Sequence, residues 1–220
     1  MIDLSGLNLY EHRLGAPIAP GKSVPGIELD VWDSPEAAGA IGCGWNPDAE
    51  ERLRHGESCA VALHGREVVS YCWSTEGPAW VGEINRLVVP EPTEVYLYDA
   101  FTLPAWRGRG LFRTLLSRLL VTSGARGRRR ALIFALATNR ASCRAIEAAG
   151  FERFDVVWRV ELVGWHHVWL RRGRLKALGV VLVTPDELAA VSAKREGRGG
   201  LGDAAPACCR ERGASGGGSP

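Results

Sequence analysis

The sequence predicts an α+β fold, a three-layer α/β arrangement in which helices flank a sheet. Apolar patterns typical of strands and of helices alternate from residue 27 to residue 172. The 220 residues are 46% hydrophobic and 24% charged, which is the composition of a globular protein, and the length suits one domain with appendages. These observations exclude a large multidomain protein and a chain that is disordered throughout.

The first half of this domain is expected to contain a strand, two helices and a hairpin. Residues 27–32 have a strand pattern. Residues 33–36 and 46–48 each combine an Asp or Asn suited to a helix cap with a proline suited to the first turn. The apolar runs 58–63 and 67–74 are separated by a His-Gly-Arg turn, which predicts two antiparallel strands.

The centre of the domain is expected to contain a strand followed directly by a helix. Residues 94–103 are rich in aromatic and branched side chains, and Pro104 ends this run. Apolar residues then recur at i, i+3, i+4, i+7 and i+8, which forms one stripe along a helix. The residues of this stripe are Phe112, Leu115, Leu116, Leu119 and Leu120.

Four further elements complete the domain. Residues 131–137 are continuously apolar, which predicts a buried strand. Residues 140–149 predict a helix that ends at Gly150, a residue suited to the carboxyl cap. Residues 154–162 and 166–170 predict two antiparallel strands.

Appendages flank the domain, which we assign to residues 27–175. Residues 1–26 are punctuated by Gly and Pro, which predicts an extended arm. Residues 176–195 contain a short apolar run and the Thr-x-x-Glu spacing of a capping box, which predicts a short β-α extension. Residues 196–220 are rich in Gly, Ala, Arg and Ser, and this composition predicts a disordered tail.

Charge and cysteine content narrow the functional classes. The formal net charge is only +2, although 24 of the 27 basic residues are Arg, and this balance argues against a nucleic-acid partner. The start of the chain lacks the apolar run of an export signal, and no apolar run approaches the roughly 20 residues of a membrane helix. We therefore expect a cytoplasmic protein with no membrane partner. The six cysteines show no Cys-x-x-Cys spacing, so we expect free thiols and no metal site.

The segment from Arg107 to Phe112, with the sequence Arg-Gly-Arg-Gly-Leu-Phe, has the properties of an anion site. It joins the predicted central strand to the predicted amphipathic helix, so free main-chain N–H groups and the positive end of a helix converge there. The glycines let the backbone approach a ligand closely, and Arg107 and Arg109 add positive charge. Pyrophosphate is the expected ligand, and a tight turn with solvated arginines is the alternative.

A second segment follows about thirty residues later. Asn139, Ser142 and Ile146 come directly after the predicted strand at 131–137, with spacings that place them on one helix face. The helix that they begin ends in a Gly-Phe pair, Gly150 and Phe151.

Together the two segments resemble the signatures of the GNAT superfamily of N-acetyltransferases. The first signature, Arg/Gln-x-x-Gly-x-Gly/Ala, is matched by Arg107 and Gly110 and imperfectly by Phe112. The second, an Asn followed by a helix and a Gly-Phe pair, is matched by Asn139 and the Gly-Phe pair after it. The order of predicted elements over residues 27–172 is also that of the family.

The resemblance implies a mixed, mostly antiparallel sheet whose fourth and fifth strands splay apart to admit acetyl-CoA, the acyl-donor substrate. Here these strands are residues 94–103 and 131–137. No metal is implied. The residues implied to bind acetyl-CoA are Phe101, Thr102 and Leu103 through their main chain, Arg107, Gly108, Arg109, Gly110, Leu111 and Phe112 around the pyrophosphate, and Asn139 and Ser142 on the opposite side.

Two departures from the family pattern affect the expected chemistry. Ile146 occupies the position, seven residues after Asn139, where the family usually carries a general-acid Tyr. The thiolate then leaves with the help of water or of another group such as Tyr98, or the protein binds acyl-CoA without turning it over. Phe112 replaces the last Gly or Ala of the phosphate turn, so its ring must point into the core.

Three carboxylates are candidates for the general base that removes a proton from the amine. Glu94 lies thirteen residues before Arg107, where some members of the family keep a glutamate. Asp99 lies in the middle of an apolar strand, where packing alone would favour an apolar side chain. Glu83 is the third candidate, and a water relay without a single base is a further alternative.

We therefore expect an acyl-CoA-dependent N-acyltransferase that uses acetyl-CoA. It would transfer the acyl group to a primary amine of a small molecule or peptide by direct attack in a ternary complex. The alternatives are a non-catalytic acyl-CoA-binding regulatory module, motivated by Ile146, and a nucleic-acid-binding protein that uses the arginine-rich run 126–130. The acceptor amine is unidentified, and a monomer and a homodimer are both compatible with the sequence.

Overall fold

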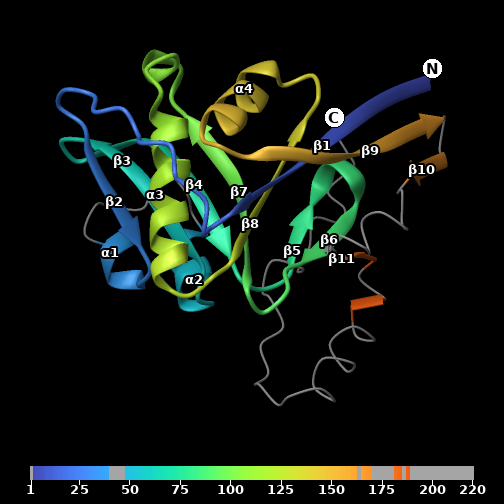
Figure 1. Ribbon diagram of the computed structural model, residues 1–220, viewed down its shortest axis with the longest axis horizontal. Coiled ribbons are helices and arrows are strands. Elements are labelled where there is room, and N and C mark those ends of the chain that lie inside the picture. The colour runs from blue at the N-terminus through green and yellow to red at the C-terminus, as the bar shows by residue number, and fades with distance from the viewer. Residues whose placement is uncertain (1, 40–47, 163–164, 170–180, 185–186, 189–220) are drawn as a thin grey trace, which may run out of the picture.

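The computed structural model describes residues 2–39, 48–162, 165–169, 181–184 and 187–188 of the chain (Figure 1). The predicted tail and most of the predicted β-α extension lie outside these ranges. Within the described ranges, helices lie on both faces of a large sheet. The predicted α+β class is therefore confirmed.

The large sheet is mixed and mostly antiparallel, as predicted. In spatial order its strands are β10 (Trp165–Trp169), β9 (Glu152–Leu162), β1 (Ile2–Arg13), β8 (Arg130–Leu136), β7 (Glu94–Thr102), β4 (Glu67–Thr75), β3 (Ser58–His64) and β2 (Glu28–Trp32). Neighbouring strands are antiparallel except β7 and β8, which run parallel. Because β7 and β8 run the same way, their carboxyl ends lie at the same edge of the sheet.

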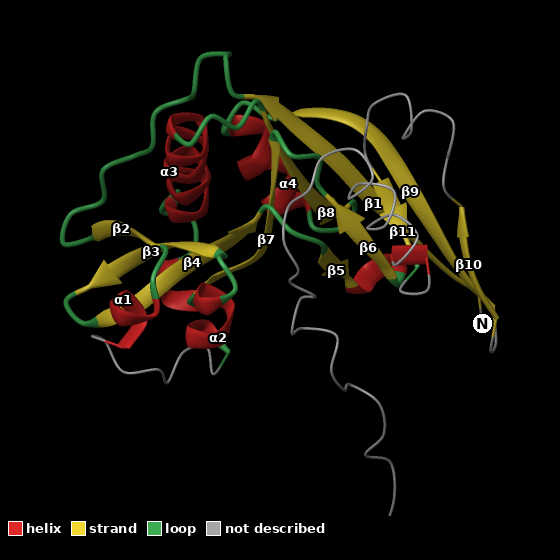
Figure 2. Cartoon of the chain, turned by 90° about the horizontal axis from the view of Figure 1, so that it is seen from below, coloured by secondary structure: helices red, strands yellow, loops and turns green. Residues whose placement is uncertain are grey.

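Two layers cover the opposite faces of the sheet, as Figure 2 shows. One face is covered by α3 (Leu111–Ala125) and α4 (Arg140–Ala148). Part of the other face is covered by α1 (Pro35–Gly39) and α2 (Ala49–Arg54), which lie over β2 to β4. The rest is covered by a small second sheet made of β5 (Ala79–Val81), β6 (Arg86–Val89) and β11 (Val181–Val183), together with the 3₁₀ helix η1 (Gly82–Ile84).

The helix predicted from the apolar stripe is α3, and the stripe is its buried face. Leu115, Leu116, Leu119 and Leu120 are each at most 1% exposed and belong to the main core cluster. Leucines at this spacing form one ridge, which packs against the alternating apolar side chains of β3, β4 and β7.

Local turn chemistry was also predicted correctly in two places. The β3–β4 hairpin turns between His64 and Glu67, and Gly65 there has φ 61°, a left-handed conformation that favours glycine. The capping box at the start of the predicted late helix is formed. The Thr184 N–H donates to Glu187 Oε2 at 2.9 Å, and the Glu187 N–H donates to Thr184 Oγ1 at 3.3 Å.

The prediction for residues 1–26 needs a correction. Its first half is β1, a strand in the interior of the sheet between β8 and β9, rather than an arm outside the domain. The alternation of side chains explains this position. Leu7 and Leu9 are buried in the core under the second sheet, whereas Tyr10 and His12 are buried on the opposite face of β1. The Gly and Pro residues that indicated an arm come after the strand.

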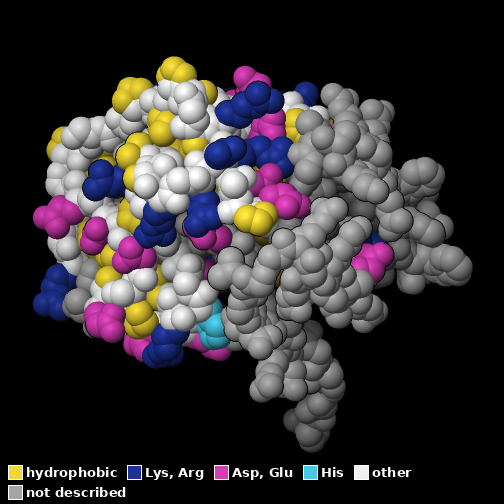
Figure 3. Space-filling model, turned by 60° about the horizontal axis from the view of Figure 1, so that its bottom comes forward, with side chains coloured by type: hydrophobic (Ala, Val, Ile, Leu, Met, Phe, Trp, Pro, Cys, Tyr) yellow, Lys and Arg dark blue, Asp and Glu magenta, His cyan; other side chains and the backbone are white. Residues whose placement is uncertain are grey.

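Charge is mixed on one face of the domain. Among the described residues on the face shown in Figure 3, Lys and Arg side chains are interspersed with Asp and Glu side chains, without a large patch of one sign. Among the helices in the described part of the chain, none has both the length and the apolar character needed to cross a membrane.

His12 is a buried ionisable group in this fold. Its side chain is 3% exposed and packs edge-on against the Phe151 ring, with 5.5 Å between ring centroids. Its Nδ1 atom has no hydrogen-bond partner in the described residues. Burial lowers the pKa of His12 below its usual value of 6.5, although main-chain contacts oppose the effect.

Because the fold keeps His12 neutral, we expect the folded protein to lose stability as the pH falls. Well above pH 6.5 the ring is neutral in the folded and unfolded chains, so His12 contributes no pH dependence there. Below that pH the unfolded chain takes up a proton first, and the free energy of unfolding should fall by up to about 1.4 kcal/mol per pH unit until the folded pKa is passed. Urea unfolding from pH 8 to pH 5 should show this slope, His12→Gln should remove it, and exposed His55→Gln should keep it. An unchanged slope in His12→Gln would contradict the assignment.

Candidate functional site

The parallel strands β7 and β8 separate halfway along β7. They pair from Glu94 with Arg130 to Leu97 with Ile133, and no further pair joins them. Beyond Leu97, β7 continues to Thr102 and pairs only with β4 on its other side. The predicted splay between these two strands is therefore confirmed, and beyond Leu97 one edge of β7 has no partner strand among the described residues (Figure 1).

A β-bulge lies where the strands separate. Tyr98 pairs with Trp73 and Ala100 pairs with Cys72, so Asp99 between them has no partner on β4. Asp99 has φ 44°, in the left-handed region that only a few non-glycine residues adopt. The extra residue bends β7 and redirects the side chain of Asp99, a distortion that is common beside active sites.

The main chain of Thr102 faces the open edge of β7. The Leu103 N–H donates to Val69 O of β4 at 2.9 Å, and Ser70 Oγ donates to Phe101 O at 3.0 Å. Because the main-chain groups of successive residues alternate between the two edges of a strand, those of Thr102 point away from β4. Of the three residues predicted to pair with acetyl-CoA through their main chain, only Thr102 has this orientation. Ala100, which was not predicted, shares it by the same alternation.

A glycine turn follows the open edge and leads into α3. A 3₁₀ helix, η2 (Pro104–Trp106), precedes it. Gly108 has φ 76° and Gly110 has φ 81°, and both conformations favour glycine. Gly110 is the N-cap of α3, and no side chain of the described residues caps this end of the helix. The first N–H groups of α3 therefore remain available to an anion.

The other predicted residues of the turn have distinct roles in the fold. Leu111 is buried, and Phe112 packs against the main core, so the ring points inward as expected. Arg107 Nε donates to Thr102 O at 3.0 Å, and its guanidinium lies 5.8 Å from the Phe101 ring. Arg109 lies over the Trp106 ring at 4.6 Å.

Asn139 and Ser142 lie beyond the carboxyl end of β8, at the sheet edge where β7 also ends. Asn139 is the N-cap of α4, and its Oδ1 accepts a hydrogen bond from the Ser142 N–H at 3.1 Å. The spacing of these two residues is therefore explained by helix capping. Their predicted contact with acetyl-CoA remains a prediction.

Ile146, at the position of the family's usual Tyr, belongs to the core. It is 1% exposed and packs with Cys143 and Phe151 beneath α4. The side chain supplies no proton donor. It contributes apolar packing, and any proton for a leaving thiolate must come from elsewhere.

A polar cluster that the sequence did not predict surrounds Asp99. Arg52 of α2 donates through Nη1 to Asp99 Oδ2 at 2.5 Å and through Nε to Glu57 Oε2 at 2.8 Å. Its guanidinium lies 3.8 Å from the centroid of the Trp73 ring and 4.9 Å from that of Tyr98. The cluster joins α2 to the bulge in β7. Neither Arg52 nor Glu57 belongs to a recognisable motif, because they meet Asp99 only through the tertiary fold.

Tyr98, a predicted substitute for the missing acid, has its hydroxyl engaged in this cluster. The hydroxyl donates to Glu57 Oε2 at 2.7 Å. Burial raises the pKa of Tyr98 well above its ordinary value, the neighbouring Glu57 carboxylate adds to this increase, and Arg52 opposes it. In this arrangement Tyr98 is a weak proton donor.

The other two candidate bases lie apart from the bulge. Glu94 is 4% exposed at the start of β7, where the strands are still paired, and its carboxylate accepts hydrogen bonds from Arg130 and from the Glu91 N–H. This position fits an ion pair that fixes the register of β7 and β8, and it does not suit a base at the splayed end. Glu83 lies on η1, where its charge contributes, after burial, to a raised pKa of Tyr96.

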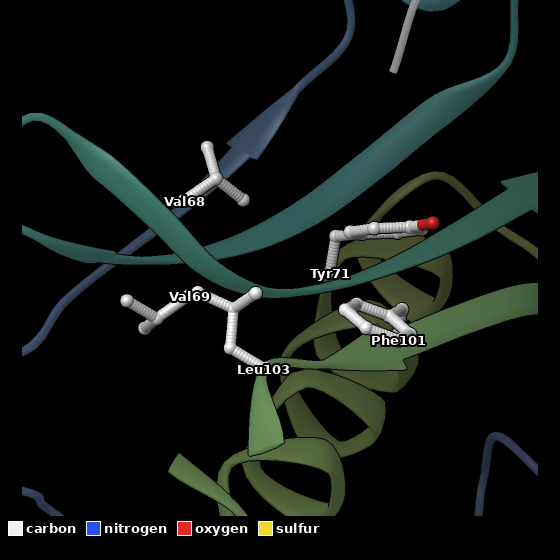
Figure 4. Close-up of a pocket in the computed structure, with 5 residues that line it drawn as sticks. All are labelled: Val68, Val69, Tyr71, Phe101 and Leu103. Carbon is white, nitrogen blue, oxygen red and sulfur yellow. The ribbon is translucent and has the colours of Figure 1, made fainter. Parts of the chain in front are cut away.

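A small hollow lies next to the bulge on β4 and β7 (Figure 4). It has a volume of about 330 Å³ and is lined by Val68, Val69, Tyr71, Phe101 and Leu103. The rings of Tyr71 and Phe101 are 6.1 Å apart. Burial, and next the Asp99 carboxylate, raise the pKa of Tyr71 to about 12.

In the described part of the chain, no group of His, Cys, Asp and Glu side chains could hold a metal ion.

Comparisons with known proteins agree with this geometry. The family model described as acetyltransferase (GNAT) family matches residues 27–151. A search of curated proteins found no match. Among solved structures, a GCN5-related N-acetyltransferase from Sphaerobacter thermophilus is 15% identical with a TM-score of 0.50, covering 72% of this chain and 51% of that one. A Drosophila protein is 15% identical with a TM-score of 0.50, covering 74% and 52%.

A third similar structure is an aminoglycoside N-acetyltransferase in complex with CoA. It is 18% identical with a TM-score of 0.47, covering 58% of this chain and 93% of that one. The chain spans about half the length of the first two structures.

Replacing Arg52 should destabilise the protein more than replacing a surface arginine of the same helix. Arg52→Gln leaves Glu57 without its partly buried partner and removes the packing on Trp73, so the free energy of unfolding should fall by about 2 kcal/mol. Arg54→Gln, which breaks the exposed pair with Glu50, should cost about 0.3 kcal/mol. Urea denaturation of both variants tests this difference. Equal losses would show that the cluster does not stabilise the fold.

Proposed function

The chain belongs to the acetyltransferase (GNAT) family, and from this premise we propose that it is an N-acyltransferase that uses acetyl-CoA. The acyl group goes to a primary amine of a small molecule or peptide, by direct attack in a ternary complex. The observation that carries this proposal is the open edge of β7, which runs from a bulge at Asp99 to an uncapped glycine turn at Gly110.

The open edge suits the extended, amide-containing arm of acetyl-CoA. Ala100 and Thr102 present main-chain donors and acceptors at the spacing of a strand, so they can pair with amides of that arm. The N–H groups of residues 108–112 can hold the diphosphate at the positive end of α3. Arg107 must then release Thr102 O, which its guanidinium occupies in the free protein.

The reaction forms one C–N bond and breaks one C–S bond. The amine nitrogen attacks the thioester carbon, the thiolate leaves, and the nitrogen loses one proton while the sulfur gains one. Asp99 is our candidate for the group that accepts the proton from the amine, directly or through a water molecule. Its side chain is 43% exposed, it lies on the bulge at the start of the open edge, and Arg52 fixes its orientation. Because Ile146 lacks a hydroxyl and the Tyr98 hydroxyl is bound to Glu57, solvent protonates the thiolate.

Asp99→Asn tests the assignment of the base. The amide keeps a hydrogen-bond acceptor for Arg52 but cannot take the proton, so kcat should fall by about 10²-fold while the Kd for acetyl-CoA changes less than about twofold.

Glu94→Gln is the matched control, because it also removes one carboxylate charge from β7. It should lower the free energy of unfolding, since it breaks the pair with Arg130, and leave kcat within a few fold. If Glu94→Gln loses as much kcat as Asp99→Asn, the base has been assigned to the wrong carboxylate.

A second candidate function is favoured by the buried Ile146. Without a general acid beside the thiol, the protein could bind acyl-CoA as a regulatory module and not turn it over. Thiol release from acetyl-CoA, measured with a panel of primary amines, separates the two functions. Turnover above the rate of hydrolysis with any amine supports the transferase, and binding without turnover across the panel supports the module.

The glycine turn gives a test of binding with a close control. Gly108 and Gly65 both have positive φ, and a Cβ on either would contact nothing within 4 Å. Gly108→Ala and Gly65→Ala should therefore cost similar stability, about 1 kcal/mol each. Only Gly108→Ala should weaken acetyl-CoA, by roughly tenfold in Kd, because its methyl group occupies the space through which the anion approaches. Calorimetric titration measures this, and equal affinity of the two variants would contradict a diphosphate at the turn.

A further inference from the structure

The segment between β1 and β2, residues 15–26, lies as a strap along α3. Ser117 Oγ donates to Ala19 O at 2.7 Å, and Arg113 Nη2 donates to Pro20 O at 3.4 Å. The Lys22 N–H then donates to Thr114 Oγ1 at 2.9 Å. As the strap runs from Ala19 to Lys22, its contacts move from the middle of α3 to the first turn of the helix. Lys22 therefore lies beside the glycine turn.

Gly21 fixes how closely the strap approaches the helix. A Cβ on Gly21 would lie 2.6 Å from Thr114 Cγ2, so any other residue would force either Thr114 or the strap to shift. The Thr114 hydroxyl accepts from the Lys22 N–H and lies within hydrogen-bonding distance of Lys22 O and of Gly110 O, at 3.3 and 3.1 Å. The main chain of Lys22 is therefore positioned against the first turn of α3.

The side chain of Lys22 lies across the glycine turn. A Cβ on Gly110 would be 3.4 Å from Lys22 Cδ and 3.9 Å from its Cγ, so the apolar stem of the lysine packs against this glycine. The ammonium group is two bonds beyond Cδ. The lysine stem therefore brings the ammonium close to Gly110, the residue that caps α3, where the positive end of the helix favours an anion.

The charged group of Lys22 differs from those of the two arginines of the turn in the contacts that it makes. Arg107 is directed to Thr102 O and Arg109 to the Trp106 ring, so both guanidinium groups rest on the preceding loop. Among the ion pairs of the described residues, none includes Lys22. Lys22 is an exposed residue, and within the described residues no ion pair of its ammonium has to break before it meets a ligand.

We propose that Lys22 binds the diphosphate of acyl-CoA and so completes the anion site from outside the segment that matches the family. The family match begins at residue 27, five residues after Lys22. The inference rests on the proposed function, since the anion is the diphosphate of acyl-CoA. Lys22 adds a positively charged side chain from the strap to the anion site. The contact of the strap with Thr114 brings this side chain to the glycine turn, where the other groups that face the diphosphate are main-chain N–H groups.

The test compares Lys22→Gln, Lys22→Arg and Arg118→Gln by calorimetric titration with CoA and with 3′-dephospho-CoA. Arg118 is an exposed residue of α3, and its replacement controls for the loss of one positive charge. Lys22→Gln should raise the Kd of both ligands roughly three- to tenfold. Lys22→Arg and Arg118→Gln should stay within about twofold of the unmodified protein. The melting temperature of Lys22→Gln should be unchanged, which a structural role of the lysine would not predict.

The outcomes separate this inference from the function on which it rests. If the unmodified protein does not bind CoA, the proposed function fails. If it binds CoA and Lys22→Gln binds equally well, or Arg118→Gln weakens binding as much, the assignment of Lys22 is wrong. If the loss in Lys22→Gln disappears with 3′-dephospho-CoA, the lysine meets the 3′-phosphate, and its assignment to the diphosphate is overturned.

Discussion

The parting of two parallel strands is the constraint on which the candidate site depends. Main-chain N–H and C=O groups inside a sheet are normally paired, because leaving them without a partner costs free energy. Here the pairing of β7 with β8 ends at Leu97, and β7 continues to Thr102 with one edge open. An open strand edge in the middle of a sheet is therefore a binding surface for an extended ligand that carries amides.

The surrounding elements define the two ends of this edge. At one end, Arg52 links α2 to the bulge at Asp99, and Glu94 with Arg130 holds the paired part of the two strands in register. At the other end, the glycine turn exposes the start of α3, and the strap from the amino-terminal strand docks beside it. Each end joins segments that are far apart in the sequence, so the site exists only in the folded chain.

The sequence predicted the parts of the fold that are written in local patterns. The leucine stripe, the His-Gly-Arg turn, the capping box and the strand-to-helix glycine turn depend on residues within a few positions of one another. The interior position of β1 was missed because its pairing with β8 is more than a hundred residues distant in the chain. The Arg52 cluster was missed for the same reason. Asp99 was singled out because a carboxylate in an apolar strand is a local anomaly. The pairing of Glu94 with Arg130 was not predicted, because the two residues are distant in the sequence, and the role of either carboxylate as a base stays a prediction.

The most direct measurement of the central claim is amide hydrogen exchange followed residue by residue by NMR, with and without saturating acetyl-CoA. The Ala100 and Thr102 amides face an edge without a partner strand and should exchange fast in the free protein. They should slow by at least about tenfold when acetyl-CoA pairs with them. The Val95 and Leu97 amides, in the paired part of β7, should change little. Saturated binding without protection of Ala100 and Thr102 would show that the donor does not lie along the open edge.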